Sequence, residues 1–167
     1  MISAIVYSSE TGSCERYAKM LAEELKVPAK PLKYCESDRF DQVVYVGWLM
    51  AGKITGLDKA REKMHVCAVV QVGMGPTGPE KADEGRNKNK LPAEVAFFCK
   101  QGAFHMDKLP LPLRLAMTMM NKKLKAELEQ KSGLDAQEQA LYKMVTTGDG
   151  EPAEWNVDDV VAWCRQH

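Results

Sequence analysis

The chain has 167 residues, which suits one domain over residues 1–167 with a sizeable buried core. Its 23 basic and 23 acidic residues balance, which argues against nucleic acid as a partner, since phosphate backbones attract proteins with excess positive charge. The five cysteines are odd in number, widely spaced and without a C-x-x-C pair. This pattern argues against a disulfide framework or a structural zinc site and favours a reducing cytosol.

The sequence also lacks the usual targeting and membrane signals. No basic leader or signal-peptide apolar block precedes the first strand-like residues, and no apolar run approaches the ~20 residues of a membrane helix. No internal repeat, low-complexity tract or linker suggests a second domain. We therefore expect a cytoplasmic protein.

The chain opens with a strand, a short loop and a helix in immediate succession. Ile2–Tyr7 is mostly apolar, as strands covered on both faces tend to be. From Cys14 onward, apolar residues recur at helical spacing with charged residues between them, and Pro28 ends this predicted helix. The loop Ser8–Cys14 therefore lies where a strand leads into a helix N-terminus.

This loop has the composition of an anion site. A helix N-terminus carries about half a positive charge and N–H groups without partners, and the loop adds hydroxyl donors but no Lys or Arg. We predict that a phosphate binds to Ser8, Ser9, Glu10, Thr11, Gly12, Ser13 and Cys14. The alternative is an ordinary strand-to-helix turn without a ligand, because so short a loop recurs by chance.

Four more strands are predicted along the chain. They are a short edge strand at Ala29–Tyr34 and three apolar strands at Asp41–Gly47, Val66–Gly73 and Val95–Cys99. A helix over Leu57–Lys63, a polar crossover over 80–90 and a final helix with Asn156 as its N-cap complete the pattern. Strands that alternate with helices imply right-handed crossovers and a parallel sheet. The natural strand order is 2-1-3-4-5, with a ligand crevice near the carboxyl ends of the first and third strands.

The loop motif Ser9-x-Thr11-Gly12-x-Cys14 resembles the phosphate loop of flavodoxins, Ser/Thr-x-Thr-Gly-x-Thr, with Cys14 in place of the last hydroxyl. The resemblance implies a flavodoxin-like three-layer α/β fold, with five parallel strands and helices on both faces. It also implies FMN as the cofactor, with its phosphate on this loop.

The same resemblance implies two loops that flank the flavin ring. The candidates are Trp48, Leu49, Met50, Ala51 and Gly52 for the first wall and Gly73, Met74 and Gly75 for the second. Many family members stack an aromatic residue on each face of the ring, but Ala51 takes that position here and the second wall has no aromatic residue. Gly52 matches a glycine whose peptide flips toward the reduced flavin in the family. Trp48 is either a ring contact or a core residue under the loop.

Residues 103–131 depart from a short flavodoxin. A helical stripe is formed by Leu113, Ala116, Met117, Met120, Leu124 and Leu128, with lysines on or near its polar side. This layout resembles the flavodoxin-like menaquinone-dependent protoporphyrinogen oxidases, which implies FMN and electron transfer to a quinone. The stripe over 113–128 either packs on the sheet or makes a peripheral contact with a membrane or a partner. His105 is a candidate proton relay or a solvated loop residue.

The resemblance implies electron transfer through FMN to a redox partner protein or a small quinone-like acceptor. Two alternatives stay open: an FMN-dependent oxidoreductase acting on a quinone or porphyrinogen-like substrate, and a flavodoxin-like interaction module without flavin. The glycines Gly73-x-Gly75-x-x-Gly78 also match the dinucleotide-binding motif. They follow the fourth strand and not the first, and two prolines interrupt the helix start, so nicotinamide binding here is disfavoured. No catalytic residue and no metal site is predicted.

Overall fold

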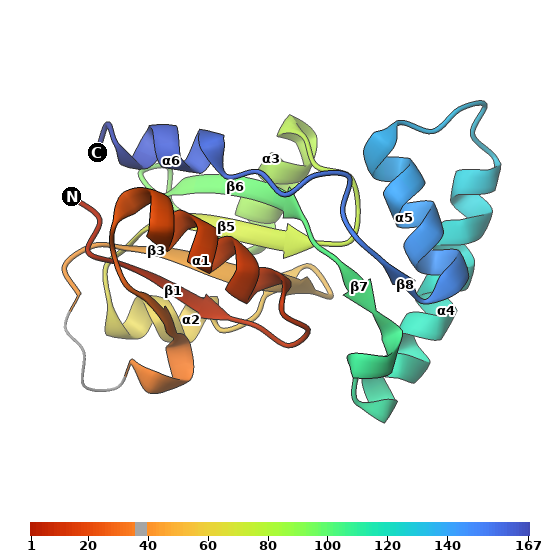
Figure 1. Cartoon of the computed structure of the whole chain (residues 1–167), viewed down its shortest axis with the longest axis horizontal. Coiled ribbons are helices and arrows are strands. Elements are labelled where there is room, and N and C mark those ends of the chain that lie inside the picture. The colour runs from red at the N-terminus through yellow and green to blue at the C-terminus, as the bar shows by residue number, and fades with distance from the viewer. Residues whose placement is uncertain (36–39) are drawn as a thin grey trace. The chain divides into compact units, whose positions relative to one another are not determined.

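The computed structural model describes residues 1–35 and 40–167 (Figure 1). The chain divides into two compact units, and each is described by itself. Unit 1 comprises Met1–Gly73, Gly78–Lys100 and Asn156–His167, and unit 2 comprises Met74–Thr77 and Gln101–Trp155. One domain over residues 1–167 stays a prediction.

Unit 1 is built on a sheet with five main strands. They are β1 Ala4–Ser8, β2 Ala29–Pro31, β3 Val43–Met50, β5 Val66–Gly73 and β6 Ala96–Gln101. Their spatial order is β2-β1-β3-β5-β6. This is the predicted order 2-1-3-4-5 once β4, Lys53–Ile54, is set aside, since that two-residue strand pairs antiparallel with β3 off the main path. The predicted flavodoxin-like α/β fold class is confirmed.

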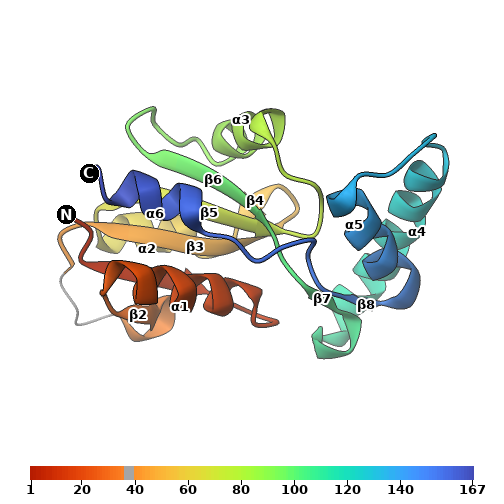
Figure 2. The same cartoon turned by 45° about the horizontal axis from the view of Figure 1, so that its top comes forward.

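Helices cover both faces of this sheet. α1 Ser13–Leu25 and α6 Asp158–Cys164 lie on one face, and α2 Leu57–Lys63 and α3 Pro79–Lys88 lie on the other (Figures 1 and 2). The central strands β1 and β3 are apolar on both sides, and Ile5, Val6, Val44 and Tyr45 are fully buried. Continuous apolar runs are expected of strands that are covered on both faces.

Several predicted boundaries differ from the structure, and two of them differ for local reasons that lie outside the candidate site. The edge strand ends at Pro31 instead of Tyr34, because the chain turns there into a 3-10 helix, η1 Leu32–Tyr34. Asn156 is not the N-cap of α6, which is Val157. The Asn156 side chain instead accepts a hydrogen bond from the backbone N–H of Asp158 (2.8 Å), so it still contacts the start of the helix.

Unit 2 holds a helical hairpin and a two-stranded ribbon. Its elements are β7 Phe104–His105, η2 Met106–Lys108, α4 Leu111–Glu129, α5 Ala136–Thr147 and β8 Asp149–Gly150. The helices α4 and α5 lie side by side in both views (Figures 1 and 2). α5 begins with a reciprocal capping box between Asp135 and Glu138, and it ends at Gly148 in the left-handed conformation (φ 75°). Neither α5 nor the ribbon was predicted from the sequence.

The predicted stripe on α4 packs inside unit 2, against α5 and β7. Leu113 and Met117 pack with Phe104 and Met144, and further along the helix Leu124 and Leu128 pack with Leu141 and Val145. Packing of this stripe on the main sheet stays a prediction. Two of its members, Ala116 and Met120, are exposed. Within the described residues, no helix is long and apolar enough to cross a membrane.

Candidate functional site

The predicted phosphate loop connects β1 to α1 as expected. Gly12 is the N-cap of α1 with φ 104°, a conformation that favours glycine, and a Cβ placed on it would meet no atom within 4 Å. The Gly12 N–H donates to Ser9 Oγ (3.2 Å) and the Gly12 carbonyl accepts from the Arg16 N–H (2.9 Å). Because the N-cap residue is a glycine, no N-cap side chain occupies the start of α1. This helix end can therefore accept an anion.

Ser8 is engaged beneath the loop. Its Oγ is hydrogen-bonded to the Tyr45 hydroxyl (2.8 Å), whose other partner is the Thr55 carbonyl oxygen (2.6 Å). Burial raises the pKa of Tyr45 above its ordinary value, so the hydroxyl stays protonated. A Cβ on Gly56 would lie 2.6 Å from Ser8 Oγ, and Gly56 also has φ 78°. Glycine is therefore required here, both for space and for backbone conformation.

The remaining loop residues divide between surface and core. Glu10 and Gly12 are exposed, and Ser9 and Thr11 are partly exposed, so the hydroxyls of Ser9 and Thr11 are accessible to a ligand. Ser13 and Cys14 are buried. Burial raises the pKa of the Cys14 thiol to about 12, so the side chain is a neutral core group and a ligand can meet only the backbone at this position.

The first predicted wall is a β-hairpin and not a loop that starts at Gly47. β3 continues to Met50 and turns back through Ala51 (φ 49°) and Gly52 (φ 81°) into β4. Two successive residues with positive φ are typical of the type I′ turn that joins two-residue hairpins. Gly47 does not end the strand: a Cβ there would lie 2.5 Å from Ile54 Cγ2, so the glycine lets β4 lie close against β3.

Side-chain exposure along this hairpin increases toward the turn. Trp48 is partly buried, while Leu49 and Met50 are 37% and 45% exposed. Ala51 is also exposed. Leu49, Met50 and Ala51 are therefore accessible to a ligand, whereas the position of Trp48 fits either of the two roles predicted for it.

The hairpin is held by Asn89, just beyond the end of α3. The buried Asn89 side chain accepts from the Ile54 N–H (2.9 Å) and donates to the carbonyl oxygens of Gly52 (3.3 Å) and Gly85 (2.8 Å). Lys53 Nζ donates to the Lys88 carbonyl oxygen nearby (2.7 Å). The Ala51–Gly52 turn is thus fixed to α3 through one amide side chain.

The loop and the hairpin leave the same edge of the sheet side by side. Ser8, the last residue of β1, is the register partner of Gly47 on the parallel strand β3. The segments that follow these two positions, Ser9–Gly12 after β1 and Trp48–Gly52 along the hairpin, therefore start from adjacent points of the sheet. This is the place where parallel α/β sheets bind ligands.

The second predicted wall divides between the two units. Gly73 is the last residue of β5 in unit 1, and a Cβ there would lie 3.7 Å from Leu49. Met74 and Gly75 belong to unit 2, where Met74 packs against the clusters around Phe104 and Leu141. The Met74 carbonyl oxygen accepts from the Gln101 side chain (2.8 Å). Their part in a flavin site stays a prediction.

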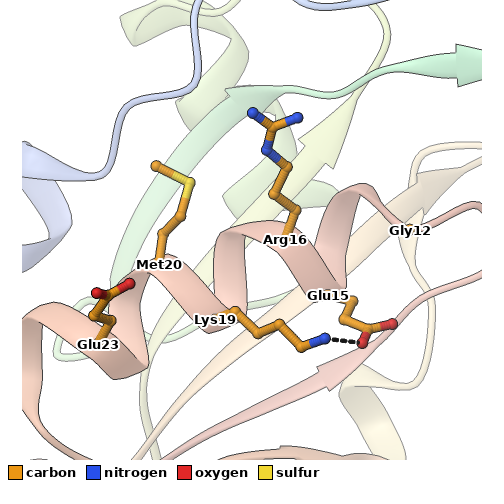
Figure 3. A pocket seen from close by; sticks show the side chains of 6 residues that line it. All are labelled: Gly12, Glu15, Arg16, Lys19, Met20 and Glu23. Atoms are coloured by element: carbon orange, nitrogen blue, oxygen red, sulfur yellow. Dashed lines mark ion pairs between the residues drawn. The ribbon is translucent and has the colours of Figure 1, made fainter.

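A surface hollow of about 300 Å³ lies along α1 and is lined by Gly12, Glu15, Arg16, Lys19, Met20 and Glu23 (Figure 3). The labelled side chains all come from this helix or its N-cap, and an exposed ion pair joins Lys19 to Glu15 (2.5 Å). Among the predicted site residues, only Gly12 lines the hollow. It is therefore a separate feature from the edge where β1 and β3 end.

His105 is not a free loop residue. It lies in β7, and its Nδ1 is 2.5 Å from the Asp149 carboxylate on β8. Both residues belong to unit 2. A role as a proton relay stays a prediction.

Four residues that support the candidate site were not predicted from the sequence: Tyr45, Thr55, Gly56 and Asn89. Tyr45 reads as one more apolar residue of a buried strand, and its partner Ser8 is 37 residues away along the chain. Asn89 lies in a polar segment whose residues look solvated, and its contacts with the hairpin span 35 and 37 residues. Only the glycine that precedes α2 was a visible local signal.

Comparison with protein families gives a match to this chain. The model described as a flavodoxin domain matches residues 4–131, from the start of β1 to just beyond α4. A comparison with curated proteins found no match. Members of the matched family commonly bind flavin, which suggests a flavin-binding function of the electron-transfer type.

Proposed function

This chain belongs to the flavodoxin domain family, and we propose that it binds FMN and transfers electrons through it. The observation that supports this most strongly is the pairing of Ser8 with Gly47, which starts the phosphate loop and the hairpin from adjacent positions. One segment offers a helix N-terminus whose N-cap is a glycine, and the other offers an exposed apolar turn. FMN has a matching anionic phosphate and an apolar ring.

In this proposal the loop holds the phosphate through the first-turn N–H groups of α1 and the accessible hydroxyls of Ser9 and Thr11. Ser8 acts beneath the loop, because its hydroxyl is already engaged with Tyr45. Met50, Ala51 and Gly52 flank the ring, and Asn89 fixes their turn. The flavin supplies the redox chemistry when bound, and the chain supplies position and electrostatics.

Affinity for FMN and for riboflavin tests the proposal, because only FMN carries the phosphate. FMN should bind the apoprotein much more tightly than riboflavin in calorimetric titrations. Thr11→Ala should weaken FMN binding by about 1–3 kcal/mol and leave riboflavin binding unchanged. Ser8→Ala is the matched control, since it also removes one hydroxyl but should not change the ratio of the two affinities.

Equal affinity for FMN and riboflavin would contradict the proposed phosphate loop. Binding of neither would favour the third class considered above, an interaction module without flavin. In that case purified protein should also lack the visible absorbance bands of flavin.

An FMN-dependent oxidoreductase that acts on a quinone or porphyrinogen-like substrate is the second candidate. It is favoured by the small, exposed Ala51 at the position where many relatives carry a stacking aromatic residue. A small side chain there leaves room for a substrate over the ring. Ala51→Trp should therefore slow reduction of a small naphthoquinone by the reduced protein, while a pure electron carrier should show no saturable quinone turnover in either form.

A further inference from the structure

Helix α4 has a second apolar face that the predicted stripe does not include. Leu111, Leu115 and Met119 follow one another at intervals of four residues, and they are 65%, 63% and 78% exposed. Residues at this spacing lie on one side of a helix. We call these three residues the outer face.

The outer face is turned away from the packed side of α4. Met117 is two residues from both Leu115 and Met119, which places it about 160° away around the helix, at about 100° per residue. It is Met117, with Leu113 and Leu124, that packs within unit 2. Burial inside unit 2 therefore does not account for the outer face, and exposed apolar clusters of this kind are typical of interaction sites.

The charge is one-sided over residues 108–126, ahead of Glu127 and Glu129 in the last turn of α4. Between residues 108 and 126 the chain carries Lys108, Arg114, Lys122, Lys123 and Lys125, and no Asp or Glu. Lys122 lies on the same side of the helix as Met119, one turn further on. Among the described residues, Lys122 forms no ion pair, while Lys123 and Lys125 have only long, exposed pairs of 3.8 Å with Glu127 and Glu129. Such pairs are weak and leave the positive charge available.

We propose that the outer face of α4 docks on an anionic lipid surface, with Leu111, Leu115 and Met119 among the acyl chains and the lysines at the headgroups. An interfacial helix combines an apolar side with basic residues in this way. The proposal does not depend on flavin binding.

The charge pattern also disfavours a second copy of the chain as the occupant. In an antiparallel pair of outer faces, the apolar half of each helix would meet the lysines of the other. In a parallel pair, the lysines of the two copies would face each other, and like charges at close range repel. A surface of anionic headgroups over hydrocarbon matches both halves of α4 at once.

Cosedimentation of the full chain with vesicles tests the proposal. The protein should bind vesicles of mixed phosphatidylglycerol and phosphatidylcholine, bind phosphatidylcholine vesicles much less, and bind more weakly as salt is raised. Leu115→Gln with Met119→Gln should weaken binding by about tenfold or more, because it removes the apolar contact. Lys122→Gln with Lys123→Gln should have an effect of similar size.

Two controls carry matched changes outside α4. Tyr34→Gln removes another large side chain that is 66% exposed, and Lys59→Gln with Lys63→Gln removes two exposed charges from α2. Both should bind vesicles like the natural chain. Three results would overturn the proposal. The natural chain does not bind anionic vesicles, the controls lose as much vesicle binding as the α4 variants, or the Leu115–Met119 double variant binds fully. A dimer in sedimentation equilibrium that this double variant abolishes would overturn it as well.

Discussion

Cys14 occupies the position where the related loop motif has a hydroxyl, yet its thiol points into the core. Its side chain is 2% exposed, and burial raises its pKa to about 12. A hydroxyl there would have to be hydrogen-bonded in the core or turned toward the loop. At this position the natural sequence therefore contributes packing and a backbone N–H instead of a polar side chain.

We expect the Cys14 thiol to make the protein less stable at alkaline pH. Its pKa in the folded state is raised from 9.0 to about 12, so the unfolded chain loses the proton first as pH rises. The stabilisation is complete below about pH 9 and declines above it, by about 1.4 kcal/mol per pH unit. Urea unfolding at several pH values should show a shallower alkaline decline for Cys14→Ala than for the natural chain. Identical slopes would mean that the thiol does not titrate in this way.

At the scale of elements, the β3–β4 hairpin depends on a residue far from it in sequence. Asn89 satisfies the N–H of Ile54 and the carbonyl oxygens of Gly52 and Gly85 with a single buried amide. Ala51 has a positive φ without being glycine, so the turn is held in a conformation that alanine does not prefer. The two hydrogen bonds that Asn89 makes to the hairpin, with Ile54 and Gly52, offset that preference.

Asn89→Ala should lower the free energy of unfolding by about 2–4 kcal/mol, because it leaves buried polar backbone groups without partners. Asn87→Ala is the matched control, since Asn87 is the same residue type in the last turn of α3 but is exposed. It should change stability by about 0.5 kcal/mol or less. Urea unfolding followed by circular dichroism measures both, and similar small effects would show that the hairpin does not need the amide.

Helix α4 allows a second comparison between neighbouring methionines. Met117 packs in the cluster with Phe104 and Met144, while Met119 is 78% exposed. Met117→Asp should lower the free energy of unfolding by about 2 kcal/mol or more, because it buries an unpaired charge. Met119→Asp should have little effect on thermal unfolding. The reverse result would mean that α4 packs through its outer face.

For the molecule as a whole, the main sheet could be predicted from the sequence. The apolar runs predicted all five main strands, the bounds of α2 and β5 were correct, and the alternation with helices indicated the observed strand order. These features depend on local apolar patterns, which can be recognised in a single sequence. The segment predicted to hold a phosphate also lies between β1 and α1, as expected, and its binding role stays a prediction.

The features that the sequence analysis missed depend mostly on contacts between distant residues. The Tyr45–Ser8 hydrogen bond, the Asn89 contacts and the approach of Ile54 to Gly47 leave no local pattern. α5 differs from these features because it could have been predicted from a local pattern. Asp135, followed three residues later by Glu138, is a recognisable capping box at a helix start. Residues 132–155 were predicted to hold no helix or strand, although this signal marks the start of α5.

The end of the family match does not coincide with a boundary between the two units. The match covers residues 4–131, which includes most of unit 1 and unit 2 as far as α4. α5, β8 and α6 follow it in the chain. The proposed loop and the hairpin both lie in unit 1 and within the match, so the central proposal can be tested on them directly.

Amide chemical shifts in the ¹⁵N-labelled chain, titrated with FMN and then with riboflavin, test that proposal most directly. We expect the amides of Thr11, Gly12, Cys14 and Glu15 to shift strongly with FMN and little with riboflavin, because only FMN brings a phosphate to the helix N-terminus. The amides of Ala51 and Gly52 should shift with both, because both ligands carry the ring. FMN that binds without moving the loop amides, or riboflavin that moves them equally, would contradict the placement of the phosphate on this loop.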